Sequence, residues 1–315
     1  MPFGNALPVR DDLLRHLTGA HGVPAVDAWF ERMPTVLEEW CARWRISISD
    51  DFPDSSLNIM AYGHSALAGP VVLKMNLPSP EILSEMEAIA QRSGHGIVRL
   101  IAADPDLAIM MLERVDPGTT LRTSGLGDEE STLIGVDVMR RFWHAPTRPD
   151  NLFPLAEWMA SLLDYPARPT YPDGPIPAAL IDRAIGVAGD LLSTSTDLVL
   201  LHGDIHHDNI LWGGDHGWVT IDPKGLIGER GFDTSTWMHN PWGIGLDPNI
   251  GAILRQRFTT FARLLDLDPY RTARWSFVFL VLSMCWTTET KDHDDLTSTM
   301  RCALEMERIM DETRA

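Results

Sequence analysis

The segment His-Gly-Asp-Ile-His-His-Asp-Asn at residues 202–209 decides how the rest of this chain is interpreted. Short apolar runs flank it on both sides, and a third run, at 217–221, leads into Asp222. Apolar runs of this length that are broken by Gly, Asp and Asn are typical of short strands joined by tight loops. We therefore expect Asp204, Asn209 and Asp222 on loops at the ends of neighbouring strands, where catalytic groups are commonly placed.

These three side chains have the chemistry that phosphoryl transfer requires. Asp204 can orient a hydroxyl group and accept its proton, while Asn209 and Asp222 can hold Mg²⁺ on the phosphates of a nucleotide. The bare Asp-x-x-x-x-Asn spacing also occurs by chance, because Asp and Asn are ordinary loop residues. The preceding His-Gly, the flanking strands and the following Ile-Asp make the full pattern much more restrictive.

The full pattern, together with Ile-Asp-Pro-Lys-Gly-Leu-Ile-Gly at 221–228, resembles the catalytic loop and metal aspartate of the aminoglycoside phosphotransferases, relatives of the protein kinases. The residues at 221–228 are most similar to those of the streptomycin-kinase-like branch of this family, the aminoglycoside/hydroxyurea antibiotic resistance kinases. The resemblance covers about residues 44–290. It implies an α+β fold of two lobes, with a nucleotide-binding lobe at 1–115 and a catalytic and acceptor-binding lobe at 116–315.

The activity that the resemblance implies is transfer of the γ-phosphate of ATP, with Mg²⁺, to a hydroxyl of a small molecule. An aminoglycoside such as streptomycin is the leading acceptor, and hydroxyurea, an amino sugar or another metabolite is the alternative. A nucleotide-binding pseudoenzyme is the alternative without turnover. A zinc site at the three histidines of 202–209, or a hydrolase that uses Asp204, would leave an upstream lysine and glutamate unexplained.

The small lobe is expected to contain a five-stranded antiparallel sheet and one helix, preceded by extra N-terminal helices. Patterning predicts its strands at 44–48, 57–62, 70–75, 96–102 and 107–113. Lys74 ends the third strand, and Ser79 is a candidate cap for the helix that follows. The resemblance implies that Lys74 contacts the nucleotide phosphates and that Glu85 on this helix holds it. Glu81 and Glu87 are the other carboxylates available there.

The resemblance also implies where the rest of the nucleotide binds. The backbone of Glu113 and Val115, between the lobes, would meet the adenine edge. Protein kinases cover the phosphates with a glycine-rich loop, and this chain has none. The polar segment that includes Ser55 and Ser56 would have to take its place, through backbone amides and hydroxyls. Lys224, two residues after the metal aspartate, is either structural or faces the phosphates.

Helical periodicity dominates the remainder of the chain. Helices are predicted at 10–43, 128–144, 155–164, 178–192, 249–265 and 269–289, with another near the C-terminus. Pro34 is expected to break or kink the first of these regions. The proline-rich segment at 165–177 is expected to be an irregular connection.

The acceptor site is the least defined part of the sequence. The resembling family builds this site at the far end of the larger lobe, near Asp204. The candidates for contact with an acceptor there are Trp237, His239, Asn240, Trp286 and Glu289. Carboxylates backed by flat aromatic faces would suit a cationic, hydroxyl-rich ligand. Tryptophans are usually core residues, however, and acidic helix ends are often simply solvated.

Composition excludes several other classes of partner. A net charge of −18 argues against a nucleic-acid binder, which needs a basic face, and disfavours anionic lipid. Residues 1–12 lack the features of a signal peptide, and the most apolar run, 275–286, is too short to span a bilayer. The three cysteines are widely spaced, which suggests reduced thiols in a cytoplasm. The oligomeric state stays open.

Overall fold

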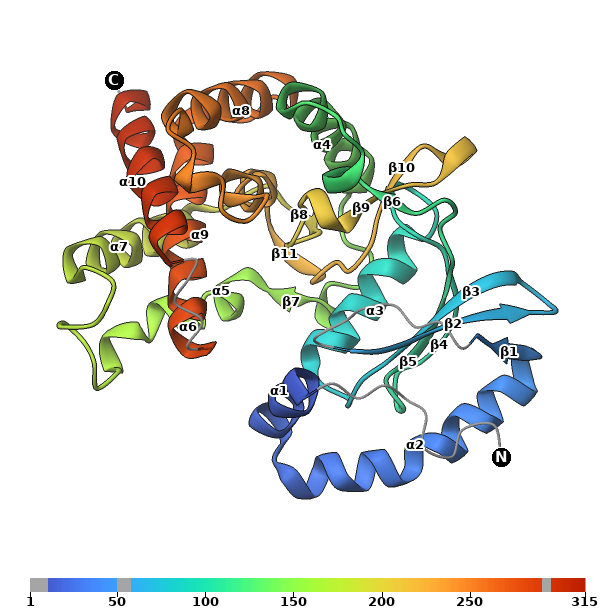
Figure 1. The fold of residues 1–315 in the computed structure, drawn as a ribbon. Coiled ribbons are helices and arrows are strands. Elements are labelled where there is room, and N and C mark those ends of the chain that lie inside the picture. The colour runs from blue at the N-terminus through green and yellow to red at the C-terminus, as the bar shows by residue number, and fades with distance from the viewer. Residues whose placement is uncertain (1–10, 50–57, 291–295, 315) are drawn as a thin grey trace.

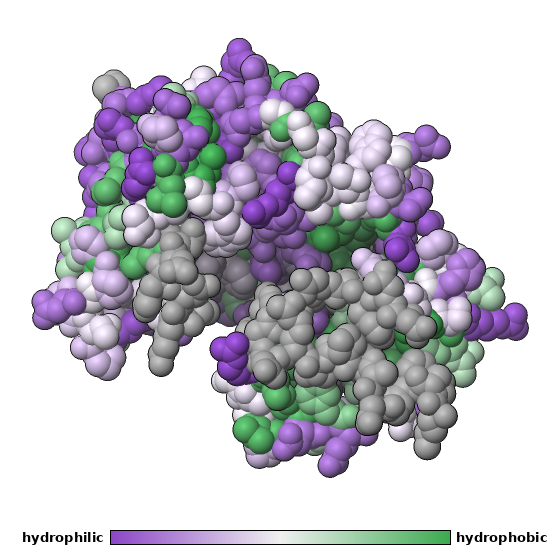
Figure 2. Space-filling model, viewed as in Figure 1, coloured by the Kyte–Doolittle hydropathy of each residue, from purple (hydrophilic) through white to green (hydrophobic). Residues whose placement is uncertain are grey.

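The structure is a computed structural model that describes residues 11–49, 58–290 and 296–314. It has two lobes, a smaller one built around a sheet and a larger one that is mainly helical (Figure 1). Hydrophilic residues gather in the recess between them (Figure 2). This α+β, two-lobed architecture confirms the predicted fold class. None of the helices in the described part of the chain combines the length and the apolar character that a membrane crossing needs.

The sheet of the small lobe has five antiparallel strands in the order β1-β2-β3-β5-β4. Its strands are β1 Ile46–Ile48, β2 Ile59–Ser65, β3 Gly69–Met75, β4 Leu100–Asp104 and β5 Ile109–Glu113. Helices α1 (Asp11–His21) and α2 (Val23–Trp44) share a hydrophobic core with one face of this sheet, and α3 (Pro80–Arg92) shares one with the other face.

Alternation along β3 determines where Lys74 points. Side chains of a strand alternate between the two faces of a sheet. Val71, Leu73 and Met75 belong to the core shared with α2. Lys74 pairs in register with Met110, which packs in the core on the α3 side. The lysine is therefore directed toward α3, the helix that carries Glu85.

The start of α3 is the one expected from its sequence. Ser79 is the N-cap, and its hydroxyl accepts a hydrogen bond from the Ile82 amide at 3.4 Å. Pro80 occupies the first helical position, where its missing N–H is not needed. Ile82, Met86 and the rest of the apolar stripe are buried against the sheet.

Several predicted boundaries in the small lobe are wrong. The strand predicted to end at residue 62 continues to Ser65, the last residue of β2. Gly63 lies within β2 for a packing reason, since a Cβ there would lie 2.8 Å from Ile46 Cγ2 on β1. Pro34 does not break α2, which runs from Val23 to Trp44. Residues on both sides of the proline, including Met33 and Leu37, are buried in the core against the sheet, which supports the helix there.

The larger lobe contains two small sheets, with strand orders β10-β9-β6 and β7-β11-β8. Their strands are β6 Thr119–Thr120, β7 Phe153–Pro154, β8 Leu198–Leu201, β9 Ile210–Trp212, β10 Trp218–Thr220 and β11 Leu226–Glu229. The sequence predicted β8, β9 and β10 as neighbours, which is wrong for β8. It pairs instead with β11, a four-residue strand that returns antiparallel after Asp222.

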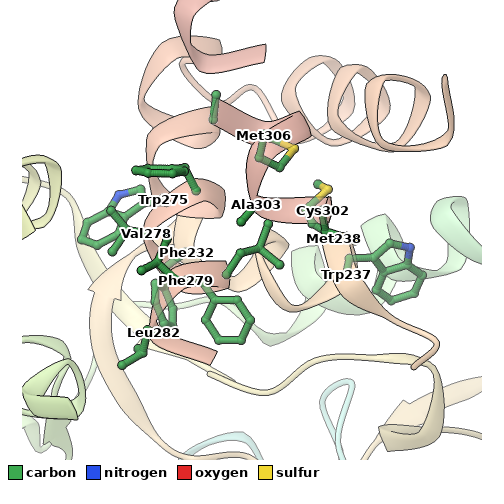
Figure 3. Packing of buried hydrophobic residues seen from close by; sticks show 14 of the residues in the cluster. Phe232, Trp237, Met238, Trp275, Val278, Phe279, Leu282, Cys302, Ala303 and Met306 are labelled. Atoms are coloured by element: carbon green, nitrogen blue, oxygen red, sulfur yellow. The ribbon is translucent and has the colours of Figure 1, made fainter. Parts of the chain in front are cut away.

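The helices of the larger lobe agree with the predicted segments apart from their ends. They are α4 Asp128–Phe142, α5 Leu155–Trp158, α6 Ala160–Leu163, α7 Ala178–Thr194, α8 Ile250–Leu264, α9 Pro269–Thr290 and α10 Leu296–Thr313. The single helix expected at 155–164 is two short helices that meet at Met159. Helix α9 lies in the centre of the core, where Trp275 and Phe279 pack against Phe232 and near side chains of α10 (Figure 3).

Candidate active site

The loop between β8 and β9 is fixed at its start by hydrogen bonds to one buried carboxylate, that of Asp233. Its oxygens accept hydrogen bonds from the backbone amides of His202, at 2.9 Å, and Gly203, at 2.7 Å. The indole N–H of Trp143 donates a third bond, also at 2.7 Å. Burial raises the pKa of Asp233 to about 6, although these three donors oppose the shift. The loop therefore leaves β8 in a fixed direction, which presents Asp204 at its tip.

His202 braces the same loop from the other side. Its Nε2 lies 2.9 Å from the carbonyl oxygen of Ile221, and its Nδ1 accepts from the Asp204 amide at 3.3 Å. This arrangement requires the ring proton on Nε2. Burial lowers the pKa of His202 to about 4, so the ring is neutral near pH 7. No group of three His, Cys, Asp or Glu side chains within the described ranges could hold a metal ion.

Asn209 and Asp222 are brought to the same side of the loop by the β9–β10 hairpin. The Asn209 amide nitrogen donates to the backbone oxygen of Asp204 at 2.9 Å. The backbone oxygen of Asn209 accepts a hydrogen bond from the Ile221 amide at 3.0 Å, which places the following residue, Asp222, close to Asn209. Asp222 has a left-handed backbone with φ of 57°, uncommon for a residue other than glycine. Such local strain is frequent where a side chain must be aimed at a functional site.

Lys74 joins the small lobe to this aspartate. Its Nζ lies 2.5 Å from Glu85 Oε1 and 3.1 Å from Asp222 Oδ1, and its side chain is only 2% exposed. Burial alone would lower the pKa of Lys74, but the charges of Asp222 and Glu85 outweigh it and raise the pKa, so the ammonium stays protonated. Of the three carboxylates available on α3, the one chosen from the sequence is the one that meets the lysine.

A contact missed in the sequence locks α3 to the loop after Asp222. Ser84 donates a hydrogen bond to the carbonyl oxygen of Gly225 at 2.6 Å and accepts one from the Phe153 amide at 2.9 Å. Gly225 has φ of 67°, and a Cβ there would lie 2.4 Å from the Ser84 carbonyl oxygen. Only glycine fits this approach. This contact fixes the position of α3 and therefore the position of Glu85, the next residue on the helix, beside Lys74.

A second lysine, Lys224, faces Asp204. Its Nζ lies 3.3 Å from Asp204 Oδ2, and His206 Nε2 lies 3.7 Å from the other carboxylate oxygen. Burial would raise the pKa of Asp204, but the nearby Lys224 and the histidines overcome it and hold the pKa below its usual value. Asp204 is therefore ionised, as a proton acceptor must be.

The segment between the lobes places Glu113 and Val115 at the end of β5. The Glu113 carboxylate binds the Arg99 side chain at 2.6 Å and the Arg99 amide at 2.7 Å, and its own amide donates to the Arg99 carbonyl at 3.0 Å. The amide of Val115 has no acceptor among the described residues, so it is free to meet a ligand edge. Ser55 and Ser56 lie outside the described residues.

The residues expected at the acceptor site fall into two groups. Trp237, His239 and Asn240 are buried beneath the catalytic loop, and the Trp237 ring packs on His207 with 4.2 Å between ring centroids. Burial lowers the pKa of His239 to about 3, and Asn240 donates to the Thr236 carbonyl at 2.8 Å.

The other two candidates, Trp286 and Glu289, lie near the end of α9. Trp286 is half-buried and packs edge-on against Trp158 and Phe279. Glu289 is exposed and forms an ion pair with Arg168 that the sequence did not predict. This carboxylate therefore already has a cationic partner within the chain.

The sequence and fold of this chain are similar to those of known small-molecule kinases. The aminoglycoside/hydroxyurea antibiotic resistance kinases match residues 46–291. The chain belongs to this family. It is similar to a streptomycin 6-kinase of Streptomyces glaucescens, with 29% identity over 83% of this chain and 85% of that protein. It is also similar to a hydroxyurea phosphotransferase of Kitasatospora aureofaciens, with 28% identity over 85% of this chain and 77% of the relative.

Solved structures support the fold independently. An aminoglycoside phosphotransferase in ternary complex with ADP and hygromycin B superimposes with a TM-score of 0.60. The two chains are only 12% identical, and the match covers 86% of this chain and 97% of the other. Family and fold together confirm the enzyme class predicted from 202–209, a small-molecule kinase that acts on hydroxyl groups.

Proposed function

We propose that this protein transfers the γ-phosphoryl group of ATP to a hydroxyl of an aminoglycoside, with streptomycin as the leading acceptor. The observation that carries the proposal is the convergence of three ion pairs where the lobes meet, one of which, Lys74 with Asp222, joins the two lobes. Lys74 is held by Glu85 and Asp222 on the nucleotide side, and Asp204 is held by Lys224 on the acceptor side. Membership of the family supports the same reaction.

The donor set around Asp222 fits a magnesium ion. One carboxylate and one amide oxygen, from Asp222 and Asn209, suit Mg²⁺, which usually takes one or two protein ligands together with substrate phosphates. The hydrogen bond from the Asn209 amide nitrogen to Asp204 leaves its amide oxygen available as a ligand. When bound, the ion neutralises charge on the β- and γ-phosphates. Asp222 and Asn209 would hold it.

The protein's own contribution is alignment and proton transfer. Asp204 is about one-third exposed and ionised, so it is proposed to orient the acceptor hydroxyl and accept its proton. Lys74 is positioned to contact the phosphates of the nucleotide. The free amide of Val115 and the backbone of Glu113 are proposed to bind the adenine edge, with Ser55 and Ser56 near the phosphates. Holding the reactants in line supplies much of the rate enhancement in such reactions.

Streptomycin is proposed as the acceptor because a streptomycin 6-kinase matches most of the chain. Its cationic groups would suit Glu289 beside the Trp286 ring, once Arg168 moves from the carboxylate. His239 and Asn240 are proposed to shape the floor of the same site, supported by Trp237. Hydroxyurea is the second candidate, because the hydroxyurea phosphotransferase matches a similar share of the chain. It is small and uncharged and needs none of these groups.

The two lobes are proposed to divide at residues 115 and 116, with nucleotide bound by 1–115 and the acceptor by 116–315. All three cysteines are thiols outside any disulfide, and two of them are buried, which agrees with the proposed cytoplasmic location. A small molecule is the proposed partner.

The test is an acceptor panel with purified protein, ATP and Mg²⁺. We expect ADP formation to depend on streptomycin and to be absent in an Asp204→Asn variant that still binds ADP. If hydroxyurea or an amino sugar is phosphorylated and streptomycin is not, the proposed acceptor is wrong and that compound takes its place. Failure of every acceptor, with normal binding of ATP, would instead support the nucleotide-binding pseudoenzyme.

A further inference from the structure

Lys74 and Lys224 occupy very different positions in this site. The Lys74 side chain is 2% exposed, and its ammonium is shared between Glu85 and Asp222. The Lys224 side chain is 28% exposed and contacts Asp204 Oδ2 at 3.3 Å. One ammonium is therefore enclosed by two carboxylates, whereas the other lies against the proposed proton acceptor with part of its surface still open.

The loop around Lys224 does not need the ammonium to hold its shape. The Lys224 amide donates to the His202 carbonyl oxygen at 2.6 Å. The next residue, Gly225, is fixed against Ser84 by close packing and by a 2.6 Å hydrogen bond. Backbone contacts on both sides thus place the lysine. A side chain anchored at its base and partly open at its tip is suited to act on a ligand.

The proposed ligand is strongly anionic, whereas the charged side chains of the site sum to −1, so a phosphoryl group needs a direct ammonium partner there. Glu85, Asp204 and Asp222 carry three negative charges, and Lys74 and Lys224 carry two positive charges. A γ-phosphoryl group in flight between ATP and the acceptor spreads charge over its three equatorial oxygens. The acceptor oxygen must lie within about 3 Å of Asp204 and about 3–3.5 Å of the phosphorus to react. An ammonium 3.3 Å from Asp204 is therefore within reach of those oxygens.

We propose that Lys224 is a further catalytic residue of this enzyme, whose ammonium contacts the γ-phosphoryl group during its transfer to the acceptor. In this step the acceptor oxygen bonds to the γ-phosphorus while the bond from that phosphorus to the β–γ bridging oxygen breaks. The acceptor proton passes to Asp204, ADP leaves, and Lys224 keeps its proton and charge throughout. The inference rests on the proposed function, because it assigns a role within phosphoryl transfer.

The proposal predicts that loss of the Lys224 ammonium affects the affinity for ATP and the affinity for ADP differently. Because the γ-phosphoryl group is the only part of the nucleotide that Lys224 is proposed to contact, Lys224→Met should leave the Kd for ADP within about twofold. The same variant should weaken binding of a non-hydrolysable ATP analogue, and kcat should fall roughly a hundred- to a thousand-fold, as when one preorganised charge stabiliser is removed. Calorimetry measures both affinities without knowledge of the acceptor.

Arg122, which lies outside the loop of Lys224 but contacts the same segment 202–209, offers a matched control. Arg122 pairs with Asp208 at 3.2 Å, so Arg122→Met also removes one cation beside the segment 202–209. Its kcat and both nucleotide affinities should stay within about twofold of the wild type. Lys224→Ala provides a second variant, in which added ethylammonium should restore part of the lost kcat by occupying the position of the missing ammonium. Thermal unfolding of each variant shows whether the fold is retained.

The outcomes separate this proposal from the proposed function. If wild-type protein phosphorylates an acceptor and Lys224→Met keeps kcat within threefold, Lys224 is not catalytic and the function stands. Equal losses of affinity for ADP and for the ATP analogue, without rescue of Lys224→Ala by ethylammonium, would show a structural role. A third outcome is that the wild type phosphorylates no acceptor, while Lys224→Met weakens binding of the ATP analogue and not of ADP. In that case the acceptor assignment fails and the γ-phosphate contact stands.

Discussion

Lys74 and Glu85, on the side proposed to bind the nucleotide, form a buried ion pair that also contacts Asp222, whereas Glu289 and Trp286, on the side proposed to bind the acceptor, lie near the end of α9. The first group is enclosed, with the lysine 2% and the glutamate 11% exposed. The Glu289 side chain is 44% exposed and pairs with an arginine from a distant segment. The groups proposed to bind the nucleotide are thus largely buried, and the carboxylate proposed to select the acceptor is exposed.

The largest effect should come from Asp204, where the two sides meet. Asp204→Asn removes the proton acceptor but keeps the shape of the side chain. We expect kcat to fall roughly a hundred- to ten-thousand-fold, the usual range for general-base catalysis, with little change in the Kd for ADP. Steady-state kinetics with each acceptor measures this. Near-normal turnover would remove Asp204 from the chemistry.

Breaking the buried cluster should affect stability as well as activity. Glu85→Gln leaves Lys74 without its nearest partner, and removal of one member of a buried ion pair costs about 3–5 kcal/mol. We expect the free energy of unfolding to fall by a comparable amount, with weaker ATP binding. Glu87→Gln is the matched control two residues along α3, since Glu87 pairs with the exposed Arg148 and does not touch Lys74. Equal losses in the two variants would mean that the Lys74 cluster has no special importance.

Acid should destabilise the protein through its buried histidines. Burial lowers the pKa of His202 to about 4 and of His207 and His239 to about 3. These rings are neutral when folded, so their unfolded forms bind more protons as pH falls from about 6.5 toward 4. Each then lowers stability by roughly 1.4 kcal/mol per pH unit.

Asp233 acts in the opposite direction in part of this range. Its raised pKa, about 6, means that the folded state binds its proton first, so this group favours folding as pH falls from about 6 to 4. Three histidines outweigh one aspartate, and we expect net destabilisation in denaturant titrations at pH 7 and pH 5. His239→Phe should make the dependence on pH shallower. A stability that does not change between these pH values would contradict the assigned burial of the rings.

The smallest effect is expected on the acceptor side. Glu289→Gln should raise the KM for streptomycin a few-fold and leave the KM for ATP unchanged, because the carboxylate is exposed and surface ion pairs contribute only about 0–1 kcal/mol. Arg168→Gln, which frees the carboxylate, should lower the KM for streptomycin. If neither variant alters it, Glu289 does not contact the acceptor.

The same contrast explains how much of the site was predictable from sequence. The pairing of Lys74 with Glu85 was predicted from the family resemblance, and the two residues are only eleven apart, on a strand and the helix that follows it. The bond from Ser84 to Gly225 spans 141 residues, and the pair of Arg168 with Glu289 spans 121. No local pattern encodes such contacts. Strand β11 was missed for the same reason, since its four residues form a strand by pairing with β8 and β7, which are distant in sequence.

The most direct test of the account is the mass of streptomycin after incubation with the protein, ATP and Mg²⁺. The account predicts that the wild type adds one phosphoryl group to streptomycin. It also predicts that Asp204→Asn adds essentially none in the same time, although it binds ADP normally. Unmodified streptomycin in the presence of active, ATP-binding wild-type protein would contradict the proposed acceptor, and equal modification by the two proteins would contradict the assigned role of Asp204.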